Sequence, residues 1–516
     1  MADSPPPTSA SPGPTLRQRT AHGVLWGVLL AAVTRGVGFV QQLALAWLLQ
    51  KSDFGLLGLA LTVTAFINLM ANPGIDVVLV QRQRRFNLWA TPAFWMGMTT
   101  GTIGMLLTMA AAPLAAWIYD KPPLTGFLLV VATALPFQAL QIVPKAKLQA
   151  ELRFRTGMLV LFAGNVLTAV LTILCAILGF GAFSFAIPLP ISAGVVAAIA
   201  WSQARPSVRW SPQVRRWKHL LRDSASLGVT KIIFQVVGIG DVIVLGLARM
   251  PDAAIGTYFF ALNVALQPFR LISRSVETVL FPSLSNVSLD PAQQVRAMVR
   301  ATRLLALVIV PVCSLQILLA GPMFRLFLPA RWLDAMLPMQ IIALTVMVSS
   351  PYWPSYSLMM AQRRFGEYLR LSIVYAATYF TTVALAVWLD RNIVTVAVAV
   401  ALWNLLSSPY IFWTAVGRER SFFSYYVETY RPYFASLGAA VPCVLAMLLL
   451  PTGLLADALA IPAVAIVYCG LYLWLLRAVA PVDSQDMLVQ LAPVLRKIGW
   501  RKLPGNVEAA KNESIP

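Results

Sequence analysis

Five polar side chains recur at helical spacing within one long apolar stretch, Ile255–Phe281. They are Asn263, Gln267, Arg270, Arg274 and Glu277, at intervals of 4, 3, 4 and 3 residues. This spacing places all five on one face of a helix. A charge at the centre of a bilayer costs about 3 kcal/mol or more, so this face must meet a polar partner or a water-filled cavity rather than lipid. We predict a cavity that takes an anionic, phosphate-bearing cargo.

Two arginines one turn apart, Arg270 and Arg274, suit a diphosphate. A guanidinium is always charged and binds two oxygens at once, which a lysine ammonium does not. The alternative is that either side chain extends toward the inner lipid head groups, and Arg274 lies about two turns from the predicted cytoplasmic end. Lys231 stands near the inner end of another apolar stretch and has the same two interpretations.

A further arginine, Arg35, lies in the first apolar stretch and shares one face with Gly38 and Gln42. We predict that Arg35 and Gln42 also line the cavity. The alternative is that Arg35 forms an ion pair that holds helices together, with one of the carboxylates described next.

Three acidic residues fall within or at the ends of apolar stretches: Asp76, Asp241 and Glu277. Asp241 lies deepest, close to Gly238 and Gly240. A carboxylate at that depth can bind a proton or Na⁺, or it can balance an arginine. For Asp76 and Glu277 we favour gate or salt-bridge roles over contact with the cargo.

The composition is that of a polytopic membrane protein. Of the 516 residues, 59% are hydrophobic and 12% charged, and the mean hydropathy is +0.73. A soluble protein has about 25% charged residues. We predict an all-α fold with about 14 transmembrane helices. The predicted spans are 23–49, 54–80, 90–118, 124–143, 157–178, 181–201, 226–248, 255–281, 304–320, 336–361, 368–389, 392–414, 433–450 and 454–476.

The Lys and Arg residues predict the orientation of these spans. Thirty of the 40 fall in alternate loops and in the two termini, six in the other loops, and four inside spans. Because cytoplasmic loops carry the excess of Lys and Arg, both termini are predicted to be cytoplasmic. The same distribution accounts for most of the net charge of +20 without nucleic acid as a partner.

Short sequence matches indicate an internal repeat. Gly55–Leu61 resembles Gly256–Leu262 at an offset of 201 residues, and Arg153-Phe154 matches Arg364-Phe365 at an offset of 211. We expect two six-helix lobes in the same orientation, a recurrent plan among transporters. The predicted division is a disordered N-terminus over 1–20, an N-lobe over 21–201, an amphipathic linker over 202–225, a C-lobe over 226–416, two further spans over 417–478 and a cytoplasmic tail over 479–516.

No constellation of catalytic residues is apparent. The four cysteines lie inside apolar runs and the two histidines near predicted helix ends, so we predict no disulfide scaffold, no metal and no cofactor. There is no Gly-rich phosphate loop ending in Lys-Ser/Thr, and no loop is large enough for a glycosyl-transfer domain. We therefore predict that the protein is not an enzyme.

Several segments resemble the Wzx-type polysaccharide flippases. They are Leu49–Gly58, Gly74-Ile-Asp76, Gln81–Arg85 and Gln149–Phe154, and their order along the chain is similar too. The resemblance implies membership of the multidrug/oligosaccharidyl-lipid/polysaccharide exporter superfamily. It also implies alternating access of two lobes around a cationic cavity, in which Arg35, Arg270 and Arg274 would contact a diphosphate.

The cargo implied by this resemblance is a polyprenyl-diphosphate-linked oligosaccharide, moved from the inner to the outer leaflet of a bacterial cytoplasmic membrane. The product would serve exopolysaccharide, capsule or lipopolysaccharide assembly, with the polymerase and chain-length machinery as possible partners. Two alternatives stay open. A multidrug or metabolite exporter of the same fold would need more carboxylates than arginines in its cavity, and a membrane glycosyltransferase or polymerase would need a large outer loop.

Overall fold

The computed structural model is mostly helical in the part of the chain that it describes. That part comprises residues 16–71, 74–82, 85–151, 153–218, 235–270, 291–349, 352–416, 422–449 and 453–479. It contains no β-strand. The chain divides into two compact units. Unit 1 is residues 1–48 with 63–232, and unit 2 is residues 49–62 with 233–516.

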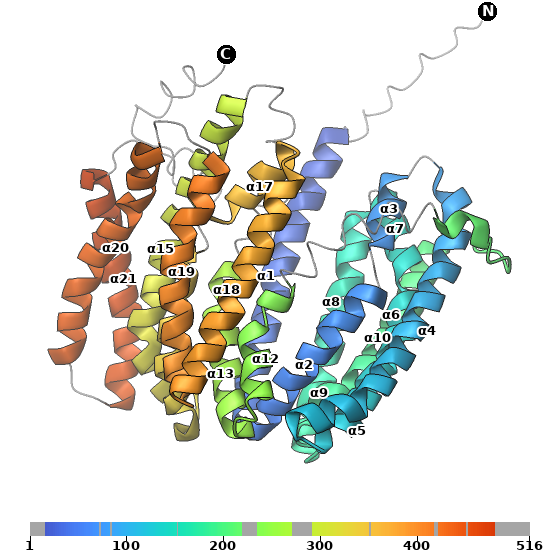
Figure 1. The fold of residues 1–516 in the computed structure, drawn as a ribbon, viewed down its shortest axis with the longest axis horizontal. Helices are drawn as coiled ribbons and strands as arrows, with labels where there is room; N and C mark the ends of the chain where they lie inside the picture. Colours follow the sequence, from blue (N-terminus) through green and yellow to red (C-terminus); the bar gives the residue numbers. More distant parts are fainter. Residues whose placement is uncertain are drawn as a thin grey trace, which may run out of the picture. The chain divides into compact units, whose positions relative to one another are not determined.

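Unit 1 is a bundle in which α1 packs against α8 and α4 packs against α5 and α6 (Figure 1). Helix α10 lies against α6 and α8. The helices are α1 (Leu16–Leu48), α3 (Ile75–Gln81), α4 (Phe86–Tyr119), α5 (Pro123–Ala132), α6 (Ala134–Leu140), α7 (Ile142–Ala150), α8 (Phe154–Ile177), α9 (Phe183–Ala186) and α10 (Pro188–Ala204), followed by a 3₁₀ turn, η2 (Val214–Arg216).

Unit 2 is a second bundle, in which α15 packs against α16, α20 and α21, and α19 against α16 and α18. The helices are α12 (Gly240–Leu247), α13 (Asp252–Ala265), α15 (Pro291–Phe327), the 3₁₀ helix η3 (Ala330–Ala335), α16 (Met336–Ser349), α17 (Pro354–Ala361), α18 (Phe365–Leu389), α19 (Ile393–Val416), α20 (Phe422–Leu449) and α21 (Leu454–Val479). Helix α2 (Lys51–Ala71) contributes its first part, through Thr62, to unit 2.

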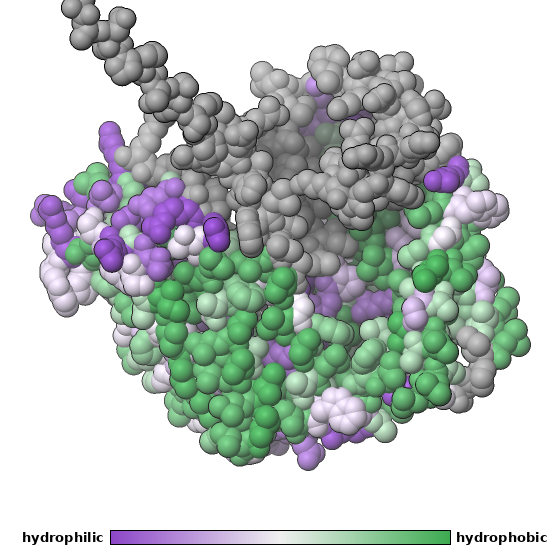
Figure 2. Space-filling view, turned by 180° about the vertical axis from the view of Figure 1, so that it is seen from behind, coloured by the Kyte–Doolittle hydropathy of each residue, from purple (hydrophilic) through white to green (hydrophobic). Residues whose placement is uncertain are grey.

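The predicted all-α membrane fold is confirmed. Ten helical segments of the described chain are long and apolar enough to cross a bilayer. Parts of the spans predicted over 226–248 and 255–281 lie outside the described residues, so the number fourteen stays a prediction. Large apolar side chains lie on the outside, with Trp388 79% and Leu449 87% exposed. Figure 2 shows apolar side chains over most of the visible described surface, as expected of helices that face lipid.

Prolines explain why one predicted span consists of several helices. The span predicted over 124–143 is broken into α5, α6 and α7. Helix α5 ends at Ala132 and α6 at Leu140, four residues before Pro136 and Pro144 respectively. A proline ring clashes with the carbonyl four residues earlier and supplies no N–H, so the helix ends there.

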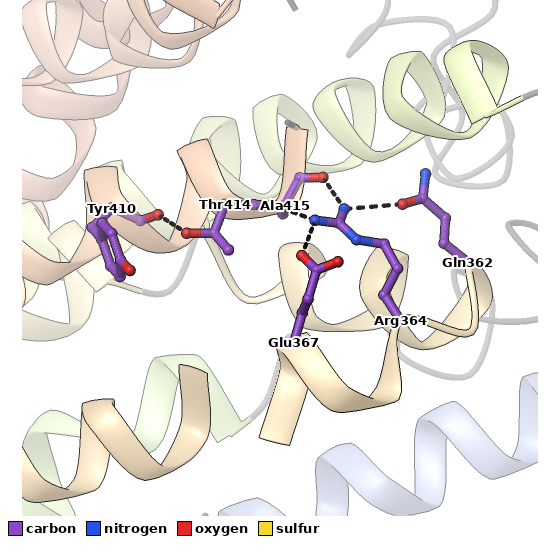
Figure 3. Close-up of polar contacts among 6 residues, drawn as sticks. All are labelled: Gln362, Arg364, Glu367, Tyr410, Thr414 and Ala415. Atoms are coloured by element: carbon purple, nitrogen blue, oxygen red, sulfur yellow. Dashed lines mark hydrogen bonds and ion pairs between the residues drawn. The ribbon is translucent and has the colours of Figure 1, made fainter. Parts of the chain in front are cut away.

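The repeat is visible in matching hydrogen bonds. The backbone N–H of Arg153 donates to Leu148 O, and that of Arg364, 211 residues later, donates to Met359 O. The guanidinium of Arg153 donates to Gln203 O at 2.9 Å, and that of Arg364 to Thr414 O at 2.9 Å and to Ala415 O at 3.1 Å (Figure 3). Each arginine thus satisfies carbonyls at the C-terminal end of another helix, where the helix dipole favours a cation.

Two glycines at equivalent repeat positions bring α2 and α13 into backbone contact within unit 2. A Cβ on Gly55 would overlap Asp252 O, and a Cβ on Gly256 would overlap Lys51 O. Around this contact Phe54 packs edge-on to Phe260 and Trp332, at ring-centroid distances of 5.7 and 5.1 Å. Only residues without a side chain allow such an approach, so these glycines fix the distance between the two helices.

We predict that Gly256→Ala lowers the thermal unfolding midpoint of the detergent-solubilised protein, because the added methyl forces α2 and α13 apart at a cost of about 1–3 kcal/mol. Gly470→Ala in α21 is the matched control, since a Cβ there meets nothing within 4 Å. It is expected to leave the midpoint unchanged or to raise it slightly. Equal midpoints for the two variants would contradict the close contact.

Candidate substrate-binding site

The polar stripe predicted after Ile255 is partly described, and its described members lie together in unit 2. Arg270 Nη1 donates to Asn263 Oδ1 at 3.0 Å, and Asn263 Nδ2 donates to Phe259 O at 2.9 Å. Asn263, Gln267 and Arg270 are all half-buried. Asn263 therefore holds the guanidinium two turns along the same stripe, as the spacing predicts.

Gln316, on α15, joins this face and was not singled out from the sequence. Its Nε2 donates to Val264 O on α13 at 2.9 Å. Its Oε1 is buried and has no hydrogen-bond partner among the described residues. The available signal was a lone glutamine inside an otherwise apolar span, but hydrophobic periodicity does not show which neighbouring helix such a side chain meets.

Asp241 forms a second polar centre of unit 2. It lies in the first turn of α12 and is only 3% exposed. Its Oδ2 accepts a hydrogen bond from the fully buried Tyr258 hydroxyl at 2.7 Å, and its Oδ1 accepts one from the backbone N–H of Val242 at 2.9 Å. Among the described residues no Lys or Arg lies within ion-pair distance of this carboxylate. A buried carboxylate held only by a hydroxyl and an N–H can bind a proton or a small cation.

The other predicted residues lie elsewhere. Arg35 and Gln42 are half-buried on α1 in unit 1, two turns apart. Asp76 lies in the first turn of α3 and lines a polar pocket inside unit 1. Arg274, Glu277 and Lys231 fall outside the described residues, so their predicted roles stay predictions.

Comparison with known proteins identifies the family. The sequence pattern of the family described as "Polysaccharide biosynthesis protein" matches residues 44–337, more than half of the chain. The chain belongs to this polysaccharide biosynthesis family. The matched range contains the whole of α2, α13 and α15, so both glycines of the close contact and all the described cavity candidates after Gln42 fall within it.

Named relatives agree with this family. The chain is 26% identical over 341 residues to the succinoglycan biosynthesis transport protein ExoT of Rhizobium meliloti (strain 1021), which covers 66% of this chain and 68% of the relative. It is 22% identical over 368 residues to the lipopolysaccharide biosynthesis protein WzxC of Escherichia coli (strain K12), covering 68% and 71%.

The fold itself is that of a solved flippase. The structure of the lipid II flippase MurJ in an inward closed conformation matches with a TM-score of 0.68, covering 88% of this chain and 99% of that one at 14% identity. At this identity the match shows the fold alone. The predicted resemblance to Wzx-type transporters is confirmed by the family and its relatives, and the multi-pass membrane architecture by the fold.

For this member of the polysaccharide biosynthesis family, we predict that Tyr258→Phe lowers the free energy of unfolding by about 1–3 kcal/mol. The reason is that Asp241 Oδ2 loses its hydrogen-bond donor while it stays buried. Asp241→Asn keeps an acceptor for Tyr258 and is expected to cost less. The measurement is thermal unfolding in detergent, with Tyr410→Phe, an exposed tyrosine, as the control. A loss no larger than the control's would show that this hydrogen bond does not stabilise the protein.

Proposed function

We propose that this protein moves a polyprenyl-diphosphate-linked oligosaccharide from the inner to the outer leaflet, for polysaccharide assembly. The family match and the names of the relatives support this function. The main support for the binding site is the placement of Arg270. This side chain lies half-buried within an apolar bundle and is oriented by Asn263. A positive charge in such a place is costly unless an anion or a polar cavity faces it.

The position of Arg270 after α13 fits an entry from the inner leaflet. The 14 residues of α13, Asp252–Ala265, rise about 21 Å, and Arg270 follows the end of this helix by five residues. The hydrocarbon core is about 30 Å thick, so in the predicted orientation Arg270 lies in its inner half. In our proposal the guanidinium binds the diphosphate there, together with Arg274, Arg35 and Lys231, while Gln42, Asn263 and Gln267 supply polar contacts.

The proposal also covers the membrane in which the protein acts, its orientation and its partners. The protein acts in the bacterial cytoplasmic membrane, with both termini in the cytoplasm and with two lobes, 21–201 and 226–416, that alternate in access. Spans over 417–478 complete the bundle. Polymerase and chain-length machinery consume the product on the outer side. In this proposal the protein only moves its cargo and breaks no bond in it.

Transbilayer movement in liposomes tests the proposed site. We expect Arg270→Ala to reduce movement of a polyprenyl-diphosphate oligosaccharide at least tenfold, because removing a charge-assisted contact costs about 1.5–3 kcal/mol. Arg270→Lys should be intermediate, since it keeps the charge but loses the two-pronged geometry. The control is Arg477→Ala, which removes an exposed arginine at the end of α21.

If movement of the lipid-linked oligosaccharide needs the protein but is unchanged in Arg270→Ala, the flippase function stands and Arg270 is excluded as its binding site. Uptake of a cationic dye, with no movement of the lipid-linked oligosaccharide, would instead favour the multidrug exporter that shares this fold.

We propose Asp241 as the group that couples movement to a proton or Na⁺ gradient. We expect Asp241→Asn to fold and bind cargo but to move it at a rate that no longer responds to either gradient, because the variant side chain cannot carry a charge. The control is Asp120→Asn, at a left-handed helix end that asparagine tolerates. A gradient response that survives in Asp241→Asn would exclude this carboxylate as the coupling group.

A further inference from the structure

A pocket of about 540 Å³, lined by both polar and apolar side chains, lies entirely within unit 1. Its walls come from the first turn of α3 and from α6, α7, α8 and α10. The volume is in the range of small-molecule sites. It is separate from the polar stripe of α13 and from Asp241, which belong to unit 2.

Three amide side chains in this pocket are available to a ligand. Gln138, Gln149 and Asn165 are exposed, and none of them makes a side-chain hydrogen bond within the described structure. Each offers two N–H donors and a carbonyl acceptor. They come from α6, α7 and α8, so the pocket presents donors and acceptors from three sides.

The back of the pocket is organised by a buried glutamine. Gln141 is 6% exposed, its Nε2 donates to Ala193 O at 2.7 Å, and its Oε1 accepts from Lys145 Nζ at 2.5 Å. The Asp76 carboxylate is near enough to act electrostatically on Lys145. The amine of Lys145 is therefore held by Gln141, with the Asp76 carboxylate nearby.

The two copies of the repeat differ in this region. At the offset of 211 residues, Gln141, Lys145, Thr168 and Ser192 correspond to Tyr352, Tyr356, Tyr379 and Trp403. In unit 2 these aromatic side chains are all buried, and Tyr379 packs on Trp403 at 5.1 Å. One copy of the repeat fills the region with rings, whereas the other keeps it open and lines it with amides, hydroxyls and one lysine.

The chemistry of the lining selects a sugar over a phosphate. A phosphate site needs several converging cations or N–H groups. Here the other cation, Arg153, donates to Gln203 O and lies 3.7 Å from Glu151. Sugar hydroxyls both donate and accept, which suits amides, and the C–H faces of a sugar ring suit the apolar walls formed by Ile142, Leu161 and Leu189.

We infer that this pocket of unit 1 binds a sugar residue of the oligosaccharide head group, either neutral or carrying one carboxylate that Lys145 would pair. The inference rests on the proposed function, because the sugar is part of the lipid-linked oligosaccharide proposed as the cargo. The sugar would then be held by amides of unit 1, while the arginines stay assigned to the diphosphate.

Saturation-transfer NMR on the purified protein tests the inference. The probe is the oligosaccharide released by mild acid from the polyprenyl lipids of the cells that make this chain. We expect binding to wild type, and at least about tenfold weaker binding to Asn165→Leu and Gln138→Leu, from the loss of about 1.5 kcal/mol each. Both positions are exposed, so the variants should fold. The control is Gln50→Leu, an exposed amide in unit 2.

Parallel arms separate this inference from the proposed function. Arg270→Ala should keep saccharide binding even where it stops transbilayer movement. If the wild type moves the lipid-linked oligosaccharide but does not bind the free saccharide, the inference of a sugar site is wrong and the flippase function stands. Saccharide binding without movement would keep the pocket and overturn the flippase. Competition by inorganic phosphate or by phosphatidylglycerol vesicles would show an anion or lipid head-group site instead, and would overturn the inference.

Discussion

A polar group inside a bilayer has no water to bond, so each charged or amide side chain on these helices must find its partner within the protein or its cargo. Arginines that lie just beyond the ends of the predicted spans find such partners within the fold. Arg325 on α15 binds Asp457 on α21 through two hydrogen bonds of 2.6 and 2.8 Å. Arg153 and Arg364 satisfy carbonyls at the ends of neighbouring helices. These arginines hold helices together, and their charge is offset by the fold itself.

The residues that we assign to the site are arranged differently. Asp241 has a hydroxyl and an N–H but no cation among the described residues, and the amides of the unit 1 pocket face open space. A fold gains little stability from such arrangements, because a neutral partner offsets only part of the cost of burying a charge. They are understandable if the missing interactions are made by a cargo or a coupling ion.

The sequence predicted the helices well because lipid imposes a simple rule on their length and composition. It also predicted the polar stripe, since residues on one helix face follow from spacing alone: the bond between Asn263 and Arg270 joins two members of that stripe. It did not predict Tyr258 as the partner of Asp241, nor Gln316 against α13, because these contacts join different helices. The unit 1 pocket was missed for the same reason, as its amides lie on three different helices and each resembles an ordinary polar residue.

The two repeat copies share the residues that maintain the fold and differ at residues that line the unit 1 pocket. Positions whose role recurs in both copies, such as Gly55 with Gly256 and Arg153 with Arg364, set helix distances and cap helix ends. Positions that differ are where the copies have specialised: Lys145 stands in a pocket where the other copy has the buried Tyr356. Each copy needs its own residues that set helix distances and cap helix ends, because both copies must fold. An asymmetric cargo needs each binding contact only once. The difference between Lys145 and Tyr356 is therefore of the kind expected if one copy of the repeat binds a ligand, in line with the pocket that we infer in unit 1.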